Sequence, residues 1–325
     1  MTKFEIQQVN LQDIELSDRC YIFTFEPLIA NMVASLRHIG LQNPPLLQAL
    51  PGQRLRIVSG LRRIIALKHL QILRFPAKVA LPPTEKISEH LFLINLHENL
   101  ATRRLNLIEK ATIIHKLISE FNYSLELVVK EILPLLDVGS NPKMIDRLLP
   151  LINLEDRLKI AVIEESLSID SALDLIALPE QERTELVKLF LRFNFGKNIQ
   201  REFLQLIKDI SAANGQSISS ILSRIEIQDI LNHETLTAPV IISRLKQQLL
   251  KWRYPQYSQI QSNFEEIKRE LKLPPTISLQ PPRFFEGNKY RLEVVFQSQK
   301  DFSRAIEHLN KINQLGLIKK LEHLI

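Results

Sequence analysis

Residues 57–66 read IVSGLRRIIA, an apolar run that stops at Gly60 and is followed at once by Arg62 and Arg63. The residues before Gly60 predict a β-strand, and those after it have the spacing of an amphipathic helix. A helix that begins at the end of a strand presents free backbone N–H groups there, and such groups bind anions. Two arginines in the first turn oppose the helix dipole, which favours a negative ligand nearby. The alternative is that both arginines are surface residues of an ordinary helix.

The first 120 residues alternate strand and helix signals around this corner. Pro51 and Gly52 predict a hairpin turn, Gly40 a helix stop, and Thr84 the N-cap of a helix that runs to about residue 96. Asn106 and Glu109 have the spacing of a capping box at the start of the next helix. The predicted strands are residues 9–16, 44–50, 54–60 and 75–81, and the first helix is 27–40.

The rest of the chain is predicted to be mainly helical. The expected helices are 124–135, 143–151, 155–164, 169–178, 180–193, 197–212, 237–252 and 257–271. A proline-rich break, the alternating YRLEVVF and a helix at 299–312 then indicate a small α+β module. We therefore predict an α+β protein with an α/β N-terminal domain, an all-helical middle and this terminal module. The expected domains are 1–120, 121–195, 196–273 and 274–325.

Composition excludes several classes of protein. The chain of 325 residues has a net charge of +6, yet residues 121–190 hold 7 Lys and Arg against 13 Asp and Glu. One cysteine, Cys20, excludes an internal disulfide, and the eight histidines contain no His-x-x-x-His pair, which argues against a catalytic metal cage. Because no apolar run reaches the roughly 18 residues of a membrane span and the N-terminus lacks an apolar signal stretch, we expect a cytoplasmic protein with no membrane partner.

Three stretches together resemble a known family. SLRHIGLQNPPLLQAL, IVSGLRRIIA and ENLATRRLNLIEKA are similar to the "S-I-x-x-x-G-L-x-x-P", G-E-R-R-x-x-A and E-N-x-x-R-x-x-L-x-x-x-E-x-A boxes of the ParB/sulfiredoxin-like domain of ParB-type partition proteins. Their order and spacing agree over roughly 110 residues. ESLSIDSALDLIALPEQERTELVKLF resembles the family's "L-S-x-x-H-A-x-x-L-x-x-L-P" helical segment more weakly.

The resemblance implies a site for cytidine triphosphate (CTP) and Mg²⁺. The residues that correspond to the family's nucleotide-binding boxes are Gly60, Arg62, Arg63, Ala66, Glu98, Asn99 and Arg103, with Glu98 and Asn99 as the metal ligands. Arginine binds phosphate bidentately, and carboxylate and amide oxygens suit a magnesium ion shared with phosphates. Ala66, one turn after Arg62, is expected to leave room beside its guanidinium.

Two positions depart from the family pattern. Leu61 stands where the first box has an acidic residue, and Thr102 stands where the second box has an arginine. Arg103 is the next residue, but one step along a helix turns a side chain by about 100°. Arg103 is therefore expected to need either a long reach or a local irregularity of the helix to enter the site.

A helix-turn-helix is predicted in VVKEILPLLDVGSNPKMIDRLLPLINL, residues 128–154, with its turn around Gly139. Ser140, Asn141, Lys143 and Arg147 are the expected DNA-binding residues. Pro134 interrupts the first helix, and Asp146 shares the reading face. Because this segment is acidic, DNA affinity could instead come from the basic stretches KNIQREF, SRLKQQLLKWRYPQY and KRELK, which lie near Trp252, Tyr254 and Tyr257.

Two functions stay open at this point. The first is a ParB-like, CTP-switched DNA-binding protein of chromosome or plasmid partition or of transcriptional regulation, nucleoid-associated, homodimeric and at most a slow CTPase, with a ParA-type ATPase as a possible partner. The second is a protein that keeps the fold for another role, either a small phosphotransfer enzyme or a nucleotide-independent interaction scaffold. Sulfiredoxin chemistry needs a cysteine beside the phosphate loop, and Ser59 stands there instead.

Overall fold

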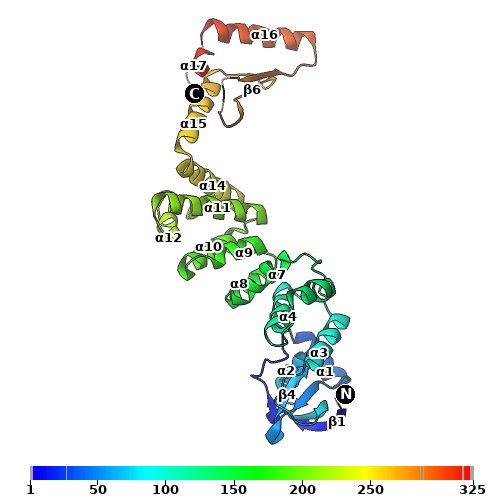
Figure 1. Cartoon of the computed structure of the whole chain (residues 1–325). Coiled ribbons are helices and arrows are strands. Elements are labelled where there is room, and N and C mark those ends of the chain that lie inside the picture. Colours follow the sequence, from blue (N-terminus) through cyan, green and yellow to red (C-terminus); the bar gives the residue numbers. More distant parts are fainter. Residues whose placement is uncertain (1–2, 27, 286, 288, 317, 323–325) are drawn as a thin grey trace. The chain divides into compact units, whose positions relative to one another are not determined.

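The computed structural model of the chain describes residues 3–26, 28–285, 287, 289–316 and 318–322. The chain divides into two compact units, Met1–Ala177 and Leu178–Ile325, whose elements are labelled in Figure 1. The predicted domain boundaries at 120, 195 and 273 lie inside these units and stay predictions. Within the described part of the chain, no helix combines the length and the apolar character that a membrane span requires.

The first unit contains a five-stranded mixed sheet in the order β1-β5-β3-β4-β2. Strand β3 pairs antiparallel with β4 and parallel with β5. The predicted strand 9–16 is divided between two strands, because the short 3₁₀ turn Leu11–Asp13 changes the chain direction where the Leu11 N–H bonds the Leu73 carbonyl. The strands are β1 (Lys3–Asn10), β2 (Ile14–Glu15), β3 (Leu46–Ala49), β4 (Leu55–Ser59) and β5 (Arg74–Leu81).

Helices α1 (Ala30–Ile39) and α2 (Leu61–His69) pack on one face of the sheet. The core between them is apolar and includes Leu36, Leu47, Ile57, Leu61, Ile64, Ala66, Leu67, Ala77 and Val79. Because side chains alternate along a strand, Gln48 and Arg56 lie on the opposite face, where both are buried. The predicted hairpin turn and the Gly40 helix stop are confirmed by the 3₁₀ turn Pro51–Gln53 between β3 and β4 and by the C-cap of α1.

After β5 the chain continues into α3 (Glu89–Thr102) and α4 (Leu107–Ser119). The prediction that a helix begins at Thr84 is wrong, since the N-cap of α3 is Ser88. Thr84 instead accepts a hydrogen bond from the Lys86 N–H, and its own N–H bonds Ala49, which holds this segment against the sheet. The capping box of α4 is confirmed, with both reciprocal hydrogen bonds present between Asn106 and Glu109.

Short helices pack around α4 in the rest of the first unit. The helix through Pro134 is not broken there, because a π-helical turn over Val128–Ile132 accommodates the proline's missing N–H. The elements are α5 (Leu125–Leu127), the π-turn, α6 (Leu133–Leu135), α7 (Lys143–Leu148), the 3₁₀ turn Leu149–Asn153, α8 (Asp156–Ile163) and α9 (Ile169–Ile176). These bounds match the predicted helices within a few residues.

The second unit is helical up to Glu270 and ends in an α+β module. Its helices are α10 (Glu180–Phe193), α11 (Lys197–Asn214), α12 (Ile218–Leu222), α13 (Ile225–Leu231), α14 (Ala238–Arg253) and α15 (Pro255–Glu270). The module contains β6 (Ile277–Gln280), the 3₁₀ turn Arg283–Phe285, β7 (Arg291–Val294), α16 (Gln299–Gln314) and α17 (Lys319–Glu322). The α+β fold class is confirmed. The sequence did not predict α12, α13, α17 and β6.

Candidate functional site

Gly60 forms the corner between β4 and α2 in a left-handed conformation, with φ 93°. A Cβ atom at this position would lie 2.9 Å from the Cβ of Pro45. Both the backbone conformation and the space therefore require glycine. The neighbour that fills this space is the protein's own Pro45.

The two arginines after this corner hold different segments of the first unit. Arg62 donates two hydrogen bonds to the Leu28 carbonyl, at 3.0 and 2.7 Å. Arg63 donates to the carbonyls of Asn43 and Pro44, at 2.8 and 3.1 Å. The guanidinium groups are thus already engaged, and a ligand would have to share or replace these acceptors.

A second nitrogen of Arg63 reaches α3. Its Nη2 atom lies 2.6 Å from Oε1 of Glu98, a contact that joins the Gly60 corner to the acidic residue of the second box. Together they border a small cavity of about 100 Å³. Its lining comprises Ile22, Thr24, Met32, Ser59, Gly60, Leu61, Arg62, Arg63, Asn95, Glu98, Asn99, Thr102 and Arg103. The structure therefore brings six of the seven predicted nucleotide-binding residues together.

Ala66 is the exception. Its side chain is fully buried in the core between α2 and the sheet and does not line this cavity. The expectation that it leaves room beside the Arg62 guanidinium is wrong, because the Arg62 guanidinium turns toward Leu28.

Arg103 reaches the cavity through a local irregularity, which is one of the two routes that the sequence left open. Helix α3 ends at Thr102, and Arg103 has extended backbone angles, φ −158° and ψ 162°. Its side chain turns back, with Nε 2.7 Å from Oδ1 of Asn99 and Nη2 3.4 Å from the Thr24 hydroxyl. The end of the helix thus places Arg103 beside the pair of predicted metal ligands.

The same arginine contacts the start of α4. Its Nη1 lies 2.7 Å from Oε2 of Glu109, the capping-box carboxylate, which is 1% exposed. Since a buried carboxylate without a partner is costly, Arg103 neutralises the charge that the capping box brings into the interior. One side chain therefore links the cavity to the first turn of α4.

The donor set fits magnesium only as an ion shared with phosphates. Glu98 and Asn99 present hard oxygen ligands at the cavity, although Arg63 and Arg103 each bond one of these oxygens. Across the residues that the structure describes, no group of three or more His, Cys, Asp or Glu could hold a metal. Phosphate oxygens and water would have to complete the coordination.

Asn95 is a cavity residue that the sequence analysis missed. It lies one turn before Asn99 and is buried at 4% exposure. Its Nδ2 donates to the Tyr21 carbonyl at 2.8 Å, and its Oδ1 accepts from Asn99 Nδ2 at 2.8 Å. The only signal in the sequence was an amide among the apolar residues of α3.

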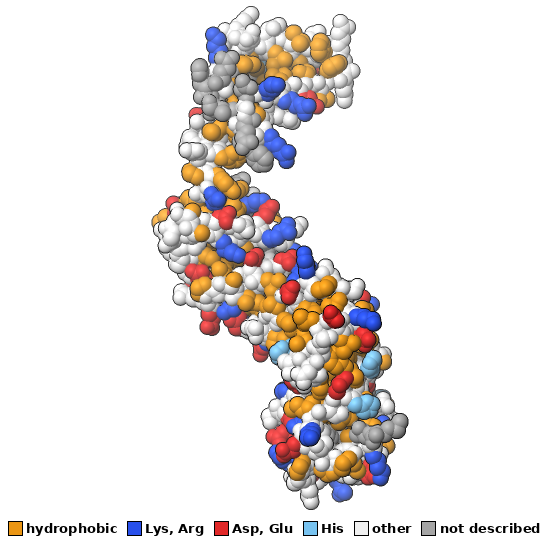
Figure 2. All heavy atoms as spheres, in the orientation of Figure 1, with side chains coloured by type: hydrophobic (Ala, Val, Ile, Leu, Met, Phe, Trp, Pro, Cys, Tyr) orange, Lys and Arg blue, Asp and Glu red, His pale blue; other side chains and the backbone are white. Residues whose placement is uncertain are grey.

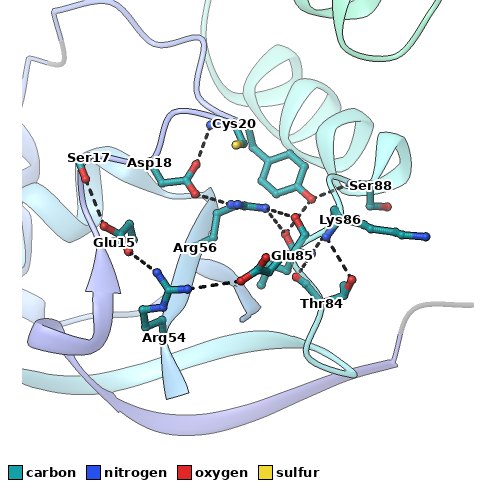
Figure 3. A network of polar contacts seen from close by, with 12 residues as sticks. Glu15, Ser17, Asp18, Cys20, Arg54, Arg56, Thr84, Glu85, Lys86 and Ser88 are labelled. Atoms are coloured by element: carbon teal, nitrogen blue, oxygen red, sulfur yellow. Dashed lines mark hydrogen bonds and ion pairs between the residues drawn. The ribbon is translucent and has the colours of Figure 1, made fainter. Parts of the chain in front are cut away.

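Tyr21 is anchored to the sheet by a buried polar network. Figure 3 shows the part of this network around Asp18, Arg56 and Ser88. The Tyr21 hydroxyl donates to Gln48 Oε1 and accepts from the Ser88 N–H, both at 2.8 Å. Arg56 lies 2.5 Å from Asp18 and also bonds the Glu85 carbonyl. Burial alone would raise the pKa of Asp18, but hydrogen bonds from Cys20 and Arg56 hold the pKa below its ordinary value. The network fixes the start of α3 and the segment that lines the cavity.

The helix-turn-helix residues lie on α7 and the turn before it. Ser140, Asn141 and Lys143 are exposed, and Oδ1 of Asn141 accepts from the Lys143 N–H at 3.0 Å. Arg147 does not project freely, because it forms a 2.6 Å ion pair with Asp170 at the start of α9. Three of the four predicted residues are therefore accessible, and the fourth is partly neutralised.

Comparison with known proteins assigns this helical segment. The predicted helix-turn-helix lies inside residues 103–196, which match the family model described as the ParB HTH domain. Residues 103–196 are thus similar to a ParB HTH domain, and the prediction of a ParB-type protein is confirmed by this match. No curated protein sequence matches the chain.

Two similar solved structures are of the C-terminally truncated chromosome-partitioning protein ParB from Caulobacter crescentus. The one complexed with CTP-gamma-S has 19% identity and a TM-score of 0.25, and the match covers 57% of this chain and 99% of that chain. The one complexed to the centromeric parS site has 18% identity and a TM-score of 0.32, with 58% and 94% covered.

Proposed function

We propose that this chain is a ParB-like DNA-binding protein whose first unit binds CTP with Mg²⁺. The observation that carries the proposal is the 2.6 Å contact between Arg63 and Glu98, which places the N-terminus of α2 and the Glu98–Asn99 pair around one cavity. Backbone N–H groups and arginines suit phosphates, and the two side-chain oxygens suit a cation. Opposite chemistries therefore lie side by side, as a metal-bound triphosphate requires.

Binding is expected to exchange the partners of Arg63 and Glu98. A cavity of about 100 Å³ is too small for a nucleotide, but a second hollow of about 690 Å³ shares Met32, Arg63, Glu98 and Thr102 with it. The ion pair is thus part of the wall between the two. When phosphate takes the place of Glu98 on Arg63, the wall opens and the carboxylate becomes available to the metal.

Calorimetric titration with cytidine and adenosine triphosphates, with and without Mg²⁺, tests this site. We expect CTP to bind more tightly with Mg²⁺, and Arg63→Ala to abolish binding. Arg54→Ala is the matched control, because this exposed arginine pairs with Glu15 and Glu85 away from the cavity. Absence of binding by either triphosphate would refute the proposed site.

The DNA-binding role rests on the ParB HTH domain and on the exposed residues at its turn. Lys143 with Ser140 and Asn141 can contact phosphates near the start of α7. Binding measured across salt concentrations should weaken with salt, and Lys143→Ala should reduce the slope of log K against log salt by about 0.9. An unchanged slope would assign the affinity to another surface, such as the basic stretches of α11, α14 and α15.

The proposed homodimer has structural support in the terminal module. In the part of the chain that the structure describes, β7 pairs with β6 alone, so its outer edge is open. Hydrophobic side chains gather over this module in Figure 2. The exposed hydrophobic residues of the module include Leu292, Val295, Phe296, Phe302 and Ile306. A two-stranded sheet is marginal alone, and a second copy could extend it.

The charges along β7 select one register for such pairing. The Val295 N–H bonds Thr276 of the β6 side, so the backbone groups of Leu292 point to the open edge. Antiparallel pairing centred on Leu292 sets Arg291 opposite the partner's Glu293, whereas centring on Glu293 opposes two carboxylates. Leu292→Lys should therefore give monomers by light scattering, and Ile72→Lys, equally exposed but in the first unit, should not.

The second candidate function is a nucleotide-independent scaffold. It is favoured by the fact that Arg62, Arg63 and Arg103 already have partners within the chain. The titration above separates the two functions, since a scaffold binds no triphosphate. Partition of chromosomes or plasmids, transcriptional regulation, slow CTP hydrolysis, a ParA-type partner and a nucleoid location all depend on the first function.

A further inference from the structure

The amide groups of Asn95 and Asn99 form a hydrogen-bond chain with a fixed direction. It begins at the Tyr21 carbonyl, which can only accept, so the donating Nδ2 of Asn95 must face it. Oδ1 of Asn95 then faces Asn99 and accepts from its Nδ2. The same Nδ2 also donates to the Asn95 carbonyl at 2.9 Å. Both donors of Asn99 are therefore directed away from the cavity.

We propose that Asn95 is a positioning residue that sets the orientation of the Asn99 amide, so that the cavity meets its oxygen and not its nitrogen. The consequence for ligand binding rests on the proposed function, because the Asn99 oxygen is the atom that can bind a cation or accept a hydrogen bond. A reversed Asn99 amide would aim donors at the Arg103 guanidinium, which has no acceptor, and would repel a metal ion. The hydrogen-bond chain thus keeps the cation-binding oxygen of the cavity apart from the arginines that attract phosphate.

Tyr21, where the hydrogen-bond chain begins, is held firmly in place. Tyr21 is fully buried, and its hydroxyl is held by Gln48 and the Ser88 N–H. Gln48 is held in turn by the carbonyls of Thr84 and Lys86, at 3.1 and 3.0 Å. The orientation of the Asn99 amide is therefore fixed, through Asn95, Tyr21 and Gln48, by strand β3 of the sheet. Second-layer partners of this kind affect metal affinity although they never touch the metal.

The test compares Asn95→Leu with Leu91→Ala in the full chain. Leucine is close to asparagine in shape and removes both hydrogen bonds, whereas Leu91 is a buried residue of the same helix with no part in the chain. The ligand-independent readout is NMR hydrogen exchange of the Asn99 side-chain amide, assigned by its absence in Asn99→Asp. We expect exchange about tenfold faster in Asn95→Leu, the fold-change for one lost hydrogen bond, and unchanged in Leu91→Ala.

A titration with CTP provides the second readout. The gain in affinity on adding Mg²⁺ should fall by about 10- to 100-fold in Asn95→Leu, while the magnesium-free affinity stays that of the Leu91→Ala control. Equal exchange in the two variants would overturn the inference. If the wild type binds no triphosphate, the proposed function fails but the exchange comparison still decides the role of Asn95. If Asn95→Leu does not fold, rapid exchange of the Asn99 amide in the wild type would be sufficient to refute it.

Discussion

The cavity at Gly60 and the turn at Gly139 use charged residues in opposite ways. Around the cavity, each arginine is bonded to groups from distant parts of the first unit, as Arg63 is to Glu98 and to the carbonyl of Asn43. At the turn, Lys143 is exposed and only Arg147 has a carboxylate partner. The difference shows two uses of charged residues: those at the cavity hold the site together, whereas Lys143 at the turn is exposed and free to contact a partner. Substitutions at the first should cost stability, and those at the second should change binding.

The largest expected effect is at the buried network that supports the cavity. Arg56→Met should lower the free energy of unfolding by about 3 to 5 kcal/mol, because it leaves Asp18 buried without its cation. Arg54→Met, at an exposed pair two residues away, should cost less than about 1 kcal/mol. Urea denaturation measures both, and equal losses would contradict the distinction between buried and exposed pairs.

The two glycines provide the most direct comparison. Gly60→Ala and Gly139→Ala both introduce a side chain at positive φ, 93° and 76°, which costs about 1 to 2 kcal/mol. Only at Gly60 does the new methyl meet Pro45, whereas nothing lies within 4 Å at Gly139. The first variant should therefore lose about 1 to 3 kcal/mol more than the second. Equal losses of unfolding free energy for the two variants would mean that Pro45 moves aside without destabilising the protein.

A smaller effect is expected at the turn, in the direction of tighter binding. Asp170→Asn removes the carboxylate that pairs with Arg147, and a released arginine should raise the salt slope of DNA binding by about 0.9. Glu126→Gln removes the same charge from an exposed position of α5 and is the control. Fluorescence anisotropy at several salt concentrations measures this slope for each protein. Identical slopes for Asp170→Asn and the unchanged protein would mean that Arg147 does not contact DNA.

The smallest effect is a pH dependence outside both regions. Burial and a 2.6 Å hydrogen bond to Glu89 raise the pKa of Tyr123 to about 12. Since the folded pKa lies above the unfolded value of about 10, the bond stabilises below pH 10 and its effect is lost as the pH rises toward 12. Tyr123→Phe should cost up to about 1 kcal/mol at neutral pH. Thermal unfolding of both proteins at pH 8 and pH 11 should show the difference shrinking.

Local patterns in the sequence predicted the elements around the site well. The strand, glycine and helix of IVSGLRRIIA have the expected order, and the capping box at Asn106 is present, because both depend on neighbouring residues. Thr84 was mistaken for a helix cap because the contacts that hold it, to Ala49 and from Gln48, come from residues more than thirty positions away. Strand β6 was missed for a similar reason, since its partner β7 follows it across the proline-rich break.

The site was predicted less completely than the elements. The resemblance to ParB-type proteins indicated Arg63, Glu98 and Asn99, but it could not show that Arg63 and Glu98 bond each other. Ala66 was expected to leave room beside Arg62, but its side chain is buried in the core and Arg62 turns to the Leu28 carbonyl, 34 residues away. Asn95 carried no motif at all. Its role depends on the Tyr21 carbonyl, which only the fold brings to α3.

Arg103 has a practical consequence for dissecting this protein. The family match begins at this residue, yet two of its hydrogen-bond acceptors, on Thr24 and Asn99, precede the match. A fragment cut at residue 103 would retain the buried Glu109 while removing the groups that hold its arginine in place. A DNA-binding fragment should therefore begin no later than Ser88, which keeps the whole of α3 and the 2.7 Å bond to Asn99 and loses the 3.4 Å bond to Thr24.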